Sequence, residues 1–171
     1  MKHFISRRNF LKAAGVTAAA SAMAAAVPQA SAGFLTGKDA AVTILYTNDV
    51  HTYIDNKSPK LTYAAIAAMK QGYMDEGKPV LLVDAGDHIQ GTAYGSMDNG
   101  ATIIELMNEA GYDIATLGNH EFDYGMARAK AIIKEADFPY VSCNWVDLRT
   151  GLRVLPAVKL FPAGGKWIAF V

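Results

Sequence analysis

From residue 42 onward, short apolar runs alternate with segments whose apolar residues recur at helical spacing. Residues 42–47 and 79–83 are apolar and rich in β-branched side chains, which is typical of buried strands. Residues 61–71 have helical periodicity and precede Gly72, so a helix that ends there is expected. The same criteria predict further strands at 113–117, 139–143, 153–161 and 166–171, a turn at 162–165, and helices at 101–110 and 126–136.

This alternation predicts an α/β fold, because right-handed crossovers between strands and helices place the strands parallel in one sheet. Ligands of such a sheet bind at the carboxyl ends of its strands. Polar clusters follow three of the predicted strands, at 48–51, 84–91 and 118–123. We therefore expect the three loops to meet at one edge of the sheet and to form a single site.

The first two loops carry side chains suited to a divalent metal ion. Asp49 and His51 are two residues apart, so in an extended chain both point the same way and offer an oxygen and a nitrogen ligand. Asp87 follows Gly86, whose lack of a Cβ allows close backbone approach, and its two oxygens could bridge two metals. The simpler alternatives are a turn aspartate beside a surface histidine and a tight turn capped by Asp87.

The third loop offers a second-metal ligand and an acid–base pair. Asn119 has an amide oxygen for a metal, and His120 can face a leaving-group or phosphoryl oxygen. Asp123 is close enough in sequence to orient that imidazole and raise its proton affinity. Alternatively, Asn119 occupies a left-handed turn and Asp123 is the N-cap of the third helix. Glu121 could be a solvated acid of a first helical turn.

Three other residues are expected to have supporting roles. Asp84 lies at the end of the second strand and is expected to be a structural hydrogen-bonding acid. The sequence offers His88 no metal-ligand partner of its own, so we expect it to be a loop residue or to support the metal ligands without binding the metal. The single cysteine, Cys143, matches no zinc spacing, so a small buried apolar role is expected.

Residues 1–32 have the layout of a cleaved signal peptide: a basic start, an uncharged Ala-rich run at 13–27 and a final Ala-Ser-Ala. The run falls short of the roughly 20 strongly apolar residues of a membrane span, so no stable span is expected. Residues 6–12, Ser-Arg-Arg-Asn-Phe-Leu-Lys, resemble a twin-arginine signal. We expect export by the twin-arginine machinery, a linker at 33–41 and a periplasmic or otherwise extracytoplasmic protein.

The charge balance argues against nucleic-acid binding. The whole chain has a formal net charge of zero. Residues 1–32 contain four basic and no acidic side chains, so the remaining residues have a net charge of −4. Nucleic-acid binding needs a concentrated basic face.

The three loops together resemble a known family. Residues 49–51, 86–87 and 118–121 are similar to the first three signature blocks of calcineurin-like metallophosphoesterases, Asp-x-His, Gly-Asp and Gly-Asn-His-Glu. Their fuller wording, including Gln90-Gly91, resembles the 5′-nucleotidase and UDP-sugar hydrolase branch. The resemblance covers residues 42–171 as the N-terminal part of the metallophosphoesterase domain. It implies the first half of an αββα sandwich, incomplete at the C-terminus.

The resemblance also implies an activity, hydrolysis of phosphate esters such as 5′-nucleotides by a water that two divalent ions (Mn²⁺, Zn²⁺ or Mg²⁺) activate. It implies roles for six residues: ligands Asp49 and His51 for one metal, bridging Asp87, second-metal ligand Asn119, and the catalytic pair His120 and Asp123.

The sequence also departs from the family. The family has later metal-binding histidines and a C-terminal domain that stacks the nucleobase, whereas no histidine follows His120 here. We therefore expect a truncated chain. A non-catalytic remnant or a metal- or phosphate-binding module is the alternative, and a thiosulfohydrolase is the alternative within the superfamily. Asp49→Ala and Asn119→Ala should abolish hydrolysis in an enzyme but change only ion binding in a module.

Overall fold

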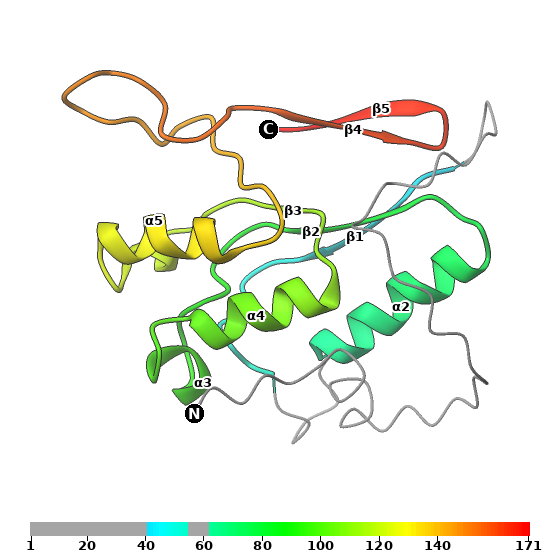
Figure 1. Ribbon diagram of the computed structural model, residues 1–171, viewed down its shortest axis with the longest axis horizontal. Helices are drawn as coiled ribbons and strands as arrows, with labels where there is room; N and C mark the ends of the chain where they lie inside the picture. Colours follow the sequence, from blue (N-terminus) through cyan, green and yellow to red (C-terminus); the bar gives the residue numbers. More distant parts are fainter. Residues whose placement is uncertain (1–40, 55–61) are drawn as a thin grey trace.

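A computed structural model of the protein describes residues 41–54 and 62–171 (Figure 1). The predicted signal peptide and nearly all of the predicted linker lie outside these residues. Within the described part of the chain, no helix is both long enough and apolar enough to cross a membrane.

The centre of the fold is a three-stranded parallel sheet in the order β1 (Thr43–Thr47), β2 (Val80–Asp84) and β3 (Ile114–Ala115). Thr47 pairs with Asp84, and Asp84 pairs with Ala115. The carboxyl ends of the three strands are therefore level, and the loops that follow them start side by side. The expected α/β arrangement with a parallel sheet is confirmed.

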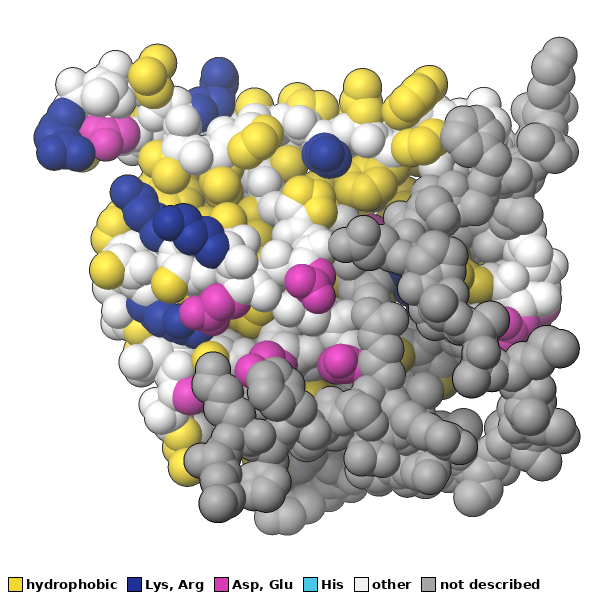
Figure 2. Space-filling view, in the orientation of Figure 1, with side chains coloured by type: hydrophobic (Ala, Val, Ile, Leu, Met, Phe, Trp, Pro, Cys, Tyr) yellow, Lys and Arg dark blue, Asp and Glu magenta, His cyan; other side chains and the backbone are white. Residues whose placement is uncertain are grey.

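Among the described residues, the α-helices beside this sheet are α2 (Tyr63–Asp75), α3 (Ala93–Ser96), α4 (Ala101–Ala110) and α5 (Met126–Glu135). Figure 1 shows α2 and α4 below the strands and the antiparallel hairpin of β4 (Lys159–Ala163) and β5 (Lys166–Phe170) above them. In Figure 2, apolar side chains gather along this hairpin, where Leu160 and Trp167 are exposed.

Helix α4 supplies the middle of the hydrophobic core. Its buried residues Ile103, Ile104, Met107 and Ala110 are spaced at i, i+1, i+4 and i+7, which is one face of a helix. This face packs with Leu82 of the sheet in one core cluster. Because the core joins sheet and helices, it holds the strand ends, and the loops that follow them, in fixed relative positions.

Several predicted boundaries are wrong. Helix α2 does not end before Gly72 but continues to Asp75, because one glycine costs only about 1 kcal/mol in a packed helix. The strand expected at 139–143 is reduced to a single bridge between Ala115 and Tyr140. The strand expected at 153–161 begins only at Lys159, since the preceding backbone is paired irregularly: Ser142 N–H donates to Pro156 O, and Val154 N–H to Trp145 O.

The turn between β4 and β5 is tighter than the four residues expected. Only Gly164 and Gly165 lie outside the strands, with φ of 56° and 74°. A two-residue turn of this kind needs positive φ at both positions, which glycine adopts without steric cost.

Replacing Gly72 with alanine should stabilise the protein by about 1 kcal/mol, because alanine loses less backbone entropy within a helix. An added Cβ would meet nothing within 4 Å. Urea unfolding provides the measurement. Gly125→Ala is the matched control, since the space there is equally open but φ is +85°, and it should destabilise. Equal changes of the same sign in both variants would contradict this account.

Candidate metal centre

The loops after β1 and β2 are joined by backbone hydrogen bonds. Asp49 N–H donates to Gly86 O at 3.1 Å, and His51 N–H donates to Asp87 O at 3.0 Å. The loop after β3 also lies against the loop after β2, since a Cβ on Gly86 would overlap the backbone nitrogen of Gly118. The three polar loops therefore meet, as the strand order requires.

Three of the site residues have left-handed backbone conformations. The φ angles of Asp49, His51 and Asp87 are 52°, 47° and 59°. Residues 49–51 are thus not extended, and the expectation based on alternating side chains is wrong in its geometry. Such a conformation costs of order 1–3 kcal/mol per non-glycine residue and persists only where surrounding contacts hold it, as the loop hydrogen bonds do here. The turn brings Asp49 Oδ1 within 3.7 Å of His51 Nε2.

One residue from each loop converges on a common point. His51, Asp87 and His120 offer ligand atoms that all lie within 4.8 Å of one another. The two imidazole rings meet edge to face, with centroids 5.0 Å apart. His51 Nδ1–H donates to Gln90 O at 3.1 Å, which leaves Nε2 as the nitrogen that can bind an ion.

Asp87 is the least exposed of these residues, at 9 %. Its Oδ1 accepts the backbone N–H of His120 at 2.8 Å, so its carboxylate is fixed relative to the third loop. A carboxylate has lone pairs beyond those of one hydrogen bond, and these can bind a cation. Among the residues predicted from the sequence, Asp87 is therefore the one at the centre of the site.

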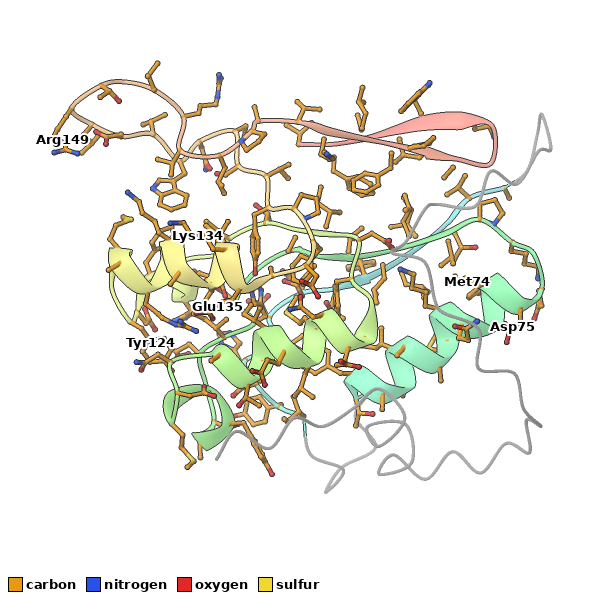
Figure 3. All side chains as sticks on the ribbon, viewed as in Figure 1. Met74, Asp75, Tyr124, Lys134, Glu135 and Arg149 are labelled. Carbon is orange, nitrogen blue, oxygen red and sulfur yellow. The ribbon has the colours of Figure 1, made fainter. Side chains whose placement is uncertain are left out.

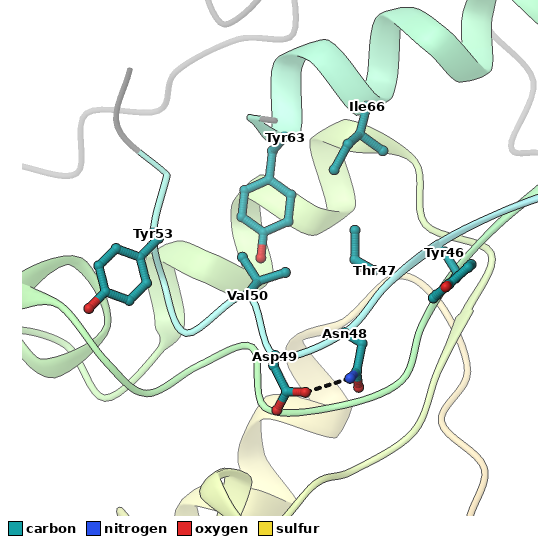
Figure 4. Close-up of a pocket in the computed structure, with 8 residues that line it drawn as sticks. All are labelled: Tyr46, Thr47, Asn48, Asp49, Val50, Tyr53, Tyr63 and Ile66. Atoms are coloured by element: carbon teal, nitrogen blue, oxygen red, sulfur yellow. Dashed lines mark hydrogen bonds between the residues drawn. The ribbon is translucent and has the colours of Figure 1, made fainter. Parts of the chain in front are cut away.

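Asp49 and Asn119 lie farther out and are exposed. Asp49 Oδ2 accepts a hydrogen bond from Asn48 Nδ2, and both residues line a pocket of about 620 Å³ beside β1 (Figure 4). Asn119 lines a second pocket, of about 350 Å³, with Phe122 and Trp145 among its neighbours. Asn119 has a φ of −73°, so the alternative of a left-handed turn at this residue is wrong.

His120 and Asp123 form a half-exposed pair. His120 Nδ1 donates to Asp123 Oδ2 at 2.7 Å. This hydrogen bond is the main cause of a raised pKa at His120; slight desolvation opposes it, and the charges of Asp123 and Asp87 add to it. Asp123 is not the N-cap of α5, as the alternative had it, because that position belongs to Gly125.

The alternative that Glu121 is a solvated acid is wrong. Its side chain is fully buried and accepts backbone N–H groups from its own loop and from the loop after β2. The donors are Gly118 at 2.6 Å and Asp87 and His88 at 2.8 Å each. Glu121 does lie in the first turn of a helix, the short 3-10 helix His120–Phe122, but the loop after β2 packs over it and buries it.

Behind the loops, a buried polar group of residues connects strand ends to the core. Asp84 accepts hydrogen bonds from Gly86 N–H at 2.8 Å and from His88 Nδ1 at 2.7 Å, as a structural acid should. His88 Nε2 lies 2.9 Å from the hydroxyl of Tyr140. Burial alone would lower the pKa of His88, but the charge and hydrogen bond of Asp84 outweigh burial and raise it.

Cys143, expected to be buried, is exposed.

Two parts of the chain match known families of sequences. Residues 42–167 match the family of calcineurin-like phosphoesterases, and residues 5–27 match the twin-arginine translocation pathway signal sequence. Export and an extracytoplasmic location follow from the second match. The resemblances inferred from the sequence are thus confirmed.

Two relatives and one solved structure illustrate the similarity. Snake venom 5′-nucleotidase of Gloydius brevicauda is 40 % identical over 114 residues, which are 60 % of this chain and 19 % of the relative. The 5′-nucleotidase of Homo sapiens is 37 % identical over 115 residues, 60 % of this chain and 20 % of the relative. The crystal structure of a 5′-nucleotidase precursor from Thermus thermophilus has a TM-score of 0.65 and 29 % identity, over 75 % of this chain and 27 % of that one. The chain spans about a fifth of the length of these curated relatives.

Proposed function

The chain belongs to the calcineurin-like phosphoesterase family, and from this membership we propose that the protein hydrolyses phosphate esters of nucleotides at a centre of two divalent metal ions. The observation that carries the proposal is the convergence of His51, Asp87 and His120 from three loops. The family match supports phosphoester hydrolysis, and the relatives named 5′-nucleotidases support the nucleotide.

The donor set fits hard or borderline divalent cations such as Mn²⁺, Zn²⁺ or Mg²⁺, since it consists of carboxylate oxygens, imidazole nitrogens and an amide oxygen. In our proposal Asp49 and His51 would hold one ion, Asn119 would hold the second, and Asp87 would bind both. When bound, the ions activate water and offset the negative charge of the phosphoryl oxygens.

His120 is the proposed catalytic side chain. With Nδ1 engaged by Asp123, its Nε2 is the atom that can donate a proton to the leaving-group oxygen or a hydrogen bond to a phosphoryl oxygen. Asp123 fixes the ring orientation and stabilises the imidazolium form. The raised pKa of His120 keeps a larger fraction protonated, as a general acid requires.

This role gives a pH-dependent prediction. Because the pKa of His120 is raised, the imidazolium form persists to higher pH and is lost as pH rises through that pKa. Asp123→Asn should lower the pKa and move the alkaline limb of the kcat/KM profile to lower pH. Asp137→Asn, a change at an exposed residue of another loop, is the control and should leave the limb in place. An unchanged limb in Asp123→Asn would contradict a proton-donating His120.

The function is tested on the exported protein purified from its own cell envelope. Phosphate release from 5′-mononucleotides is measured after chelation and after adding back Mn²⁺, Zn²⁺ or Mg²⁺. We expect hydrolysis that requires metal and is abolished by Asp49→Ala and Asn119→Ala. Asp75→Ala, at the far end of α2 (Figure 3), removes a carboxylate away from the site and should retain activity. Metal binding without hydrolysis would instead identify a binding module.

A further inference from the structure

We propose that Glu121 is a positioning residue: its buried carboxylate holds the Asp87 loop and the Asn119–His120 loop in the arrangement that binds metal. This inference rests on the proposed function only in taking these loops as the ligand loops. It assigns Glu121 no contact with substrate.

Each oxygen of Glu121 has its own set of backbone donors. Oε2 accepts from Asp87 N–H at 2.8 Å and from Gly118 N–H at 2.6 Å. Oε1 accepts from His88 N–H at 2.8 Å and from Ile89 N–H at 3.4 Å. Oε2 thus ties the loop after β2 to the loop after β3 through a single atom.

The carboxylate of Glu121 lies in the protein interior, where hydrogen-bond donors of the surrounding loops must stabilise it. Its side chain is fully buried, and besides the backbone donors it has one imidazole neighbour, His88 Nδ1 at 3.6 Å from Oε1. A buried carboxylate without such partners is strongly unfavourable, and the backbone N–H groups supply them here. The surrounding loops must therefore keep their donors directed at residue 121.

The contacts of Glu121 reach the ligands directly. Asp87 has the left-handed φ of 59°, and its own N–H is one of the groups that Glu121 accepts. Asp87 Oδ1 in turn accepts His120 N–H, and a Cβ on Gly118 would overlap that same oxygen. Because the two loops approach this closely, we expect a change at Glu121 to move Asp87 relative to Asn119 and His120.

Glutamine cannot replace this carboxylate, although it has almost the same shape. With its amide nitrogen in place of Oε2, it would face the N–H groups of Asp87 and Gly118 with further donors. With the amide rotated by 180°, its nitrogen would take the place of Oε1 and face the N–H groups of His88 and Ile89. Either orientation leaves two buried donors without an acceptor, which disfavours the observed loop arrangement.

The test is Mn²⁺ affinity, measured by electron paramagnetic resonance on the exported protein, with no substrate present. Partners of metal ligands change affinity about 10–100-fold when removed, so Glu121→Gln should bind Mn²⁺ about 10–100-fold more weakly than wild type. The matched control is Asp113→Asn. Asp113 also accepts a backbone N–H, from Leu82 at 2.7 Å, and pairs with Lys70. Asp113→Asn should lower stability and leave Mn²⁺ affinity unchanged.

Wild-type Mn²⁺ affinity in a folded Glu121→Gln would overturn the proposal, as would equal losses in Glu121→Gln and Asp113→Asn. If Glu121→Gln does not fold, two other measurements test the proposal: the Mn²⁺ affinity of Glu121→Asp, and hydrogen exchange of the backbone amides in the wild type. Glu121→Asp keeps the charge but is one methylene shorter, and it should bind Mn²⁺ with intermediate affinity. Unprotected amides at Asp87 and Gly118 in the wild type would overturn the proposal. Failure of the proposed hydrolysis alone would leave these binding results unchanged, so the two claims fail separately.

Discussion

Replacing Asp87 with asparagine should remove metal-dependent hydrolysis and lower metal affinity by more than about 100-fold, the upper range for residues that only support a ligand. Asparagine keeps the size of the side chain and can still accept the N–H of His120, which Asp87 Oδ1 accepts at 2.8 Å. It loses the negative charge and the second anionic oxygen that a bridging ligand needs. The expected loss is therefore electrostatic and not a consequence of lost packing.

Metal content after dialysis, measured together with phosphate release, checks this result. Asp98→Asn is a suitable control, since Asp98 is a partly buried acid that binds the backbone N–H of Thr102 at the start of α4. It should reduce stability without reducing metal content. A dialysed Asp87→Asn protein that keeps its metal would show that the centre lies elsewhere.

Replacing His120 with asparagine should lower kcat about 10²–10⁴-fold, the range for a general acid or base. The geometry alone allows His120 to be either a proton donor or a metal ligand. Its ligand atom lies within 4.8 Å of those of His51 and Asp87, so it could bind the same ion. The hydrogen bond from Nδ1 to Asp123 fits both roles, since it stabilises a protonated ring and also orients Nε2 toward an ion.

Measuring both metal affinity and kcat of His120→Asn distinguishes a proton donor from a metal ligand. A proton donor predicts a large loss of kcat with near wild-type metal content in His120→Asn. His51→Asn provides the comparison, because loss of a proposed ligand should reduce metal content and activity together. Loss of metal in His120→Asn to the same degree as in His51→Asn would assign His120 as a ligand.

The sheet and the edge at which the loops meet were predictable from sequence. Residues 42–47 and 79–83 are apolar runs too short for helices, and the polar residues follow them immediately. That pattern places Asp49, His51 and Asp87 at strand ends whatever the details of packing. The prediction was reliable because it depended on order along the chain and on the direction of strands.

The local conformations were not predictable in this way. The left-handed φ angles of Asp49 and His51 depend on hydrogen bonds to the neighbouring loop, at Gly86 O and Asp87 O, which no local preference indicates. The burial of Glu121 depends in the same way on backbone donors more than 30 residues earlier in the chain. Non-local contacts outweighed local propensity at both places, and both are at the site.

The central claim is that the loops after β1, β2 and β3 form one metal centre around Asp87. Anomalous diffraction at the manganese edge, from crystals of the exported protein grown with Mn²⁺, tests it most directly. We predict anomalous peaks within bonding distance of Asp87, one shared with His51 and one with Asn119. The absence of any peak next to Asp87 in crystals that hold Mn²⁺ elsewhere would contradict the account.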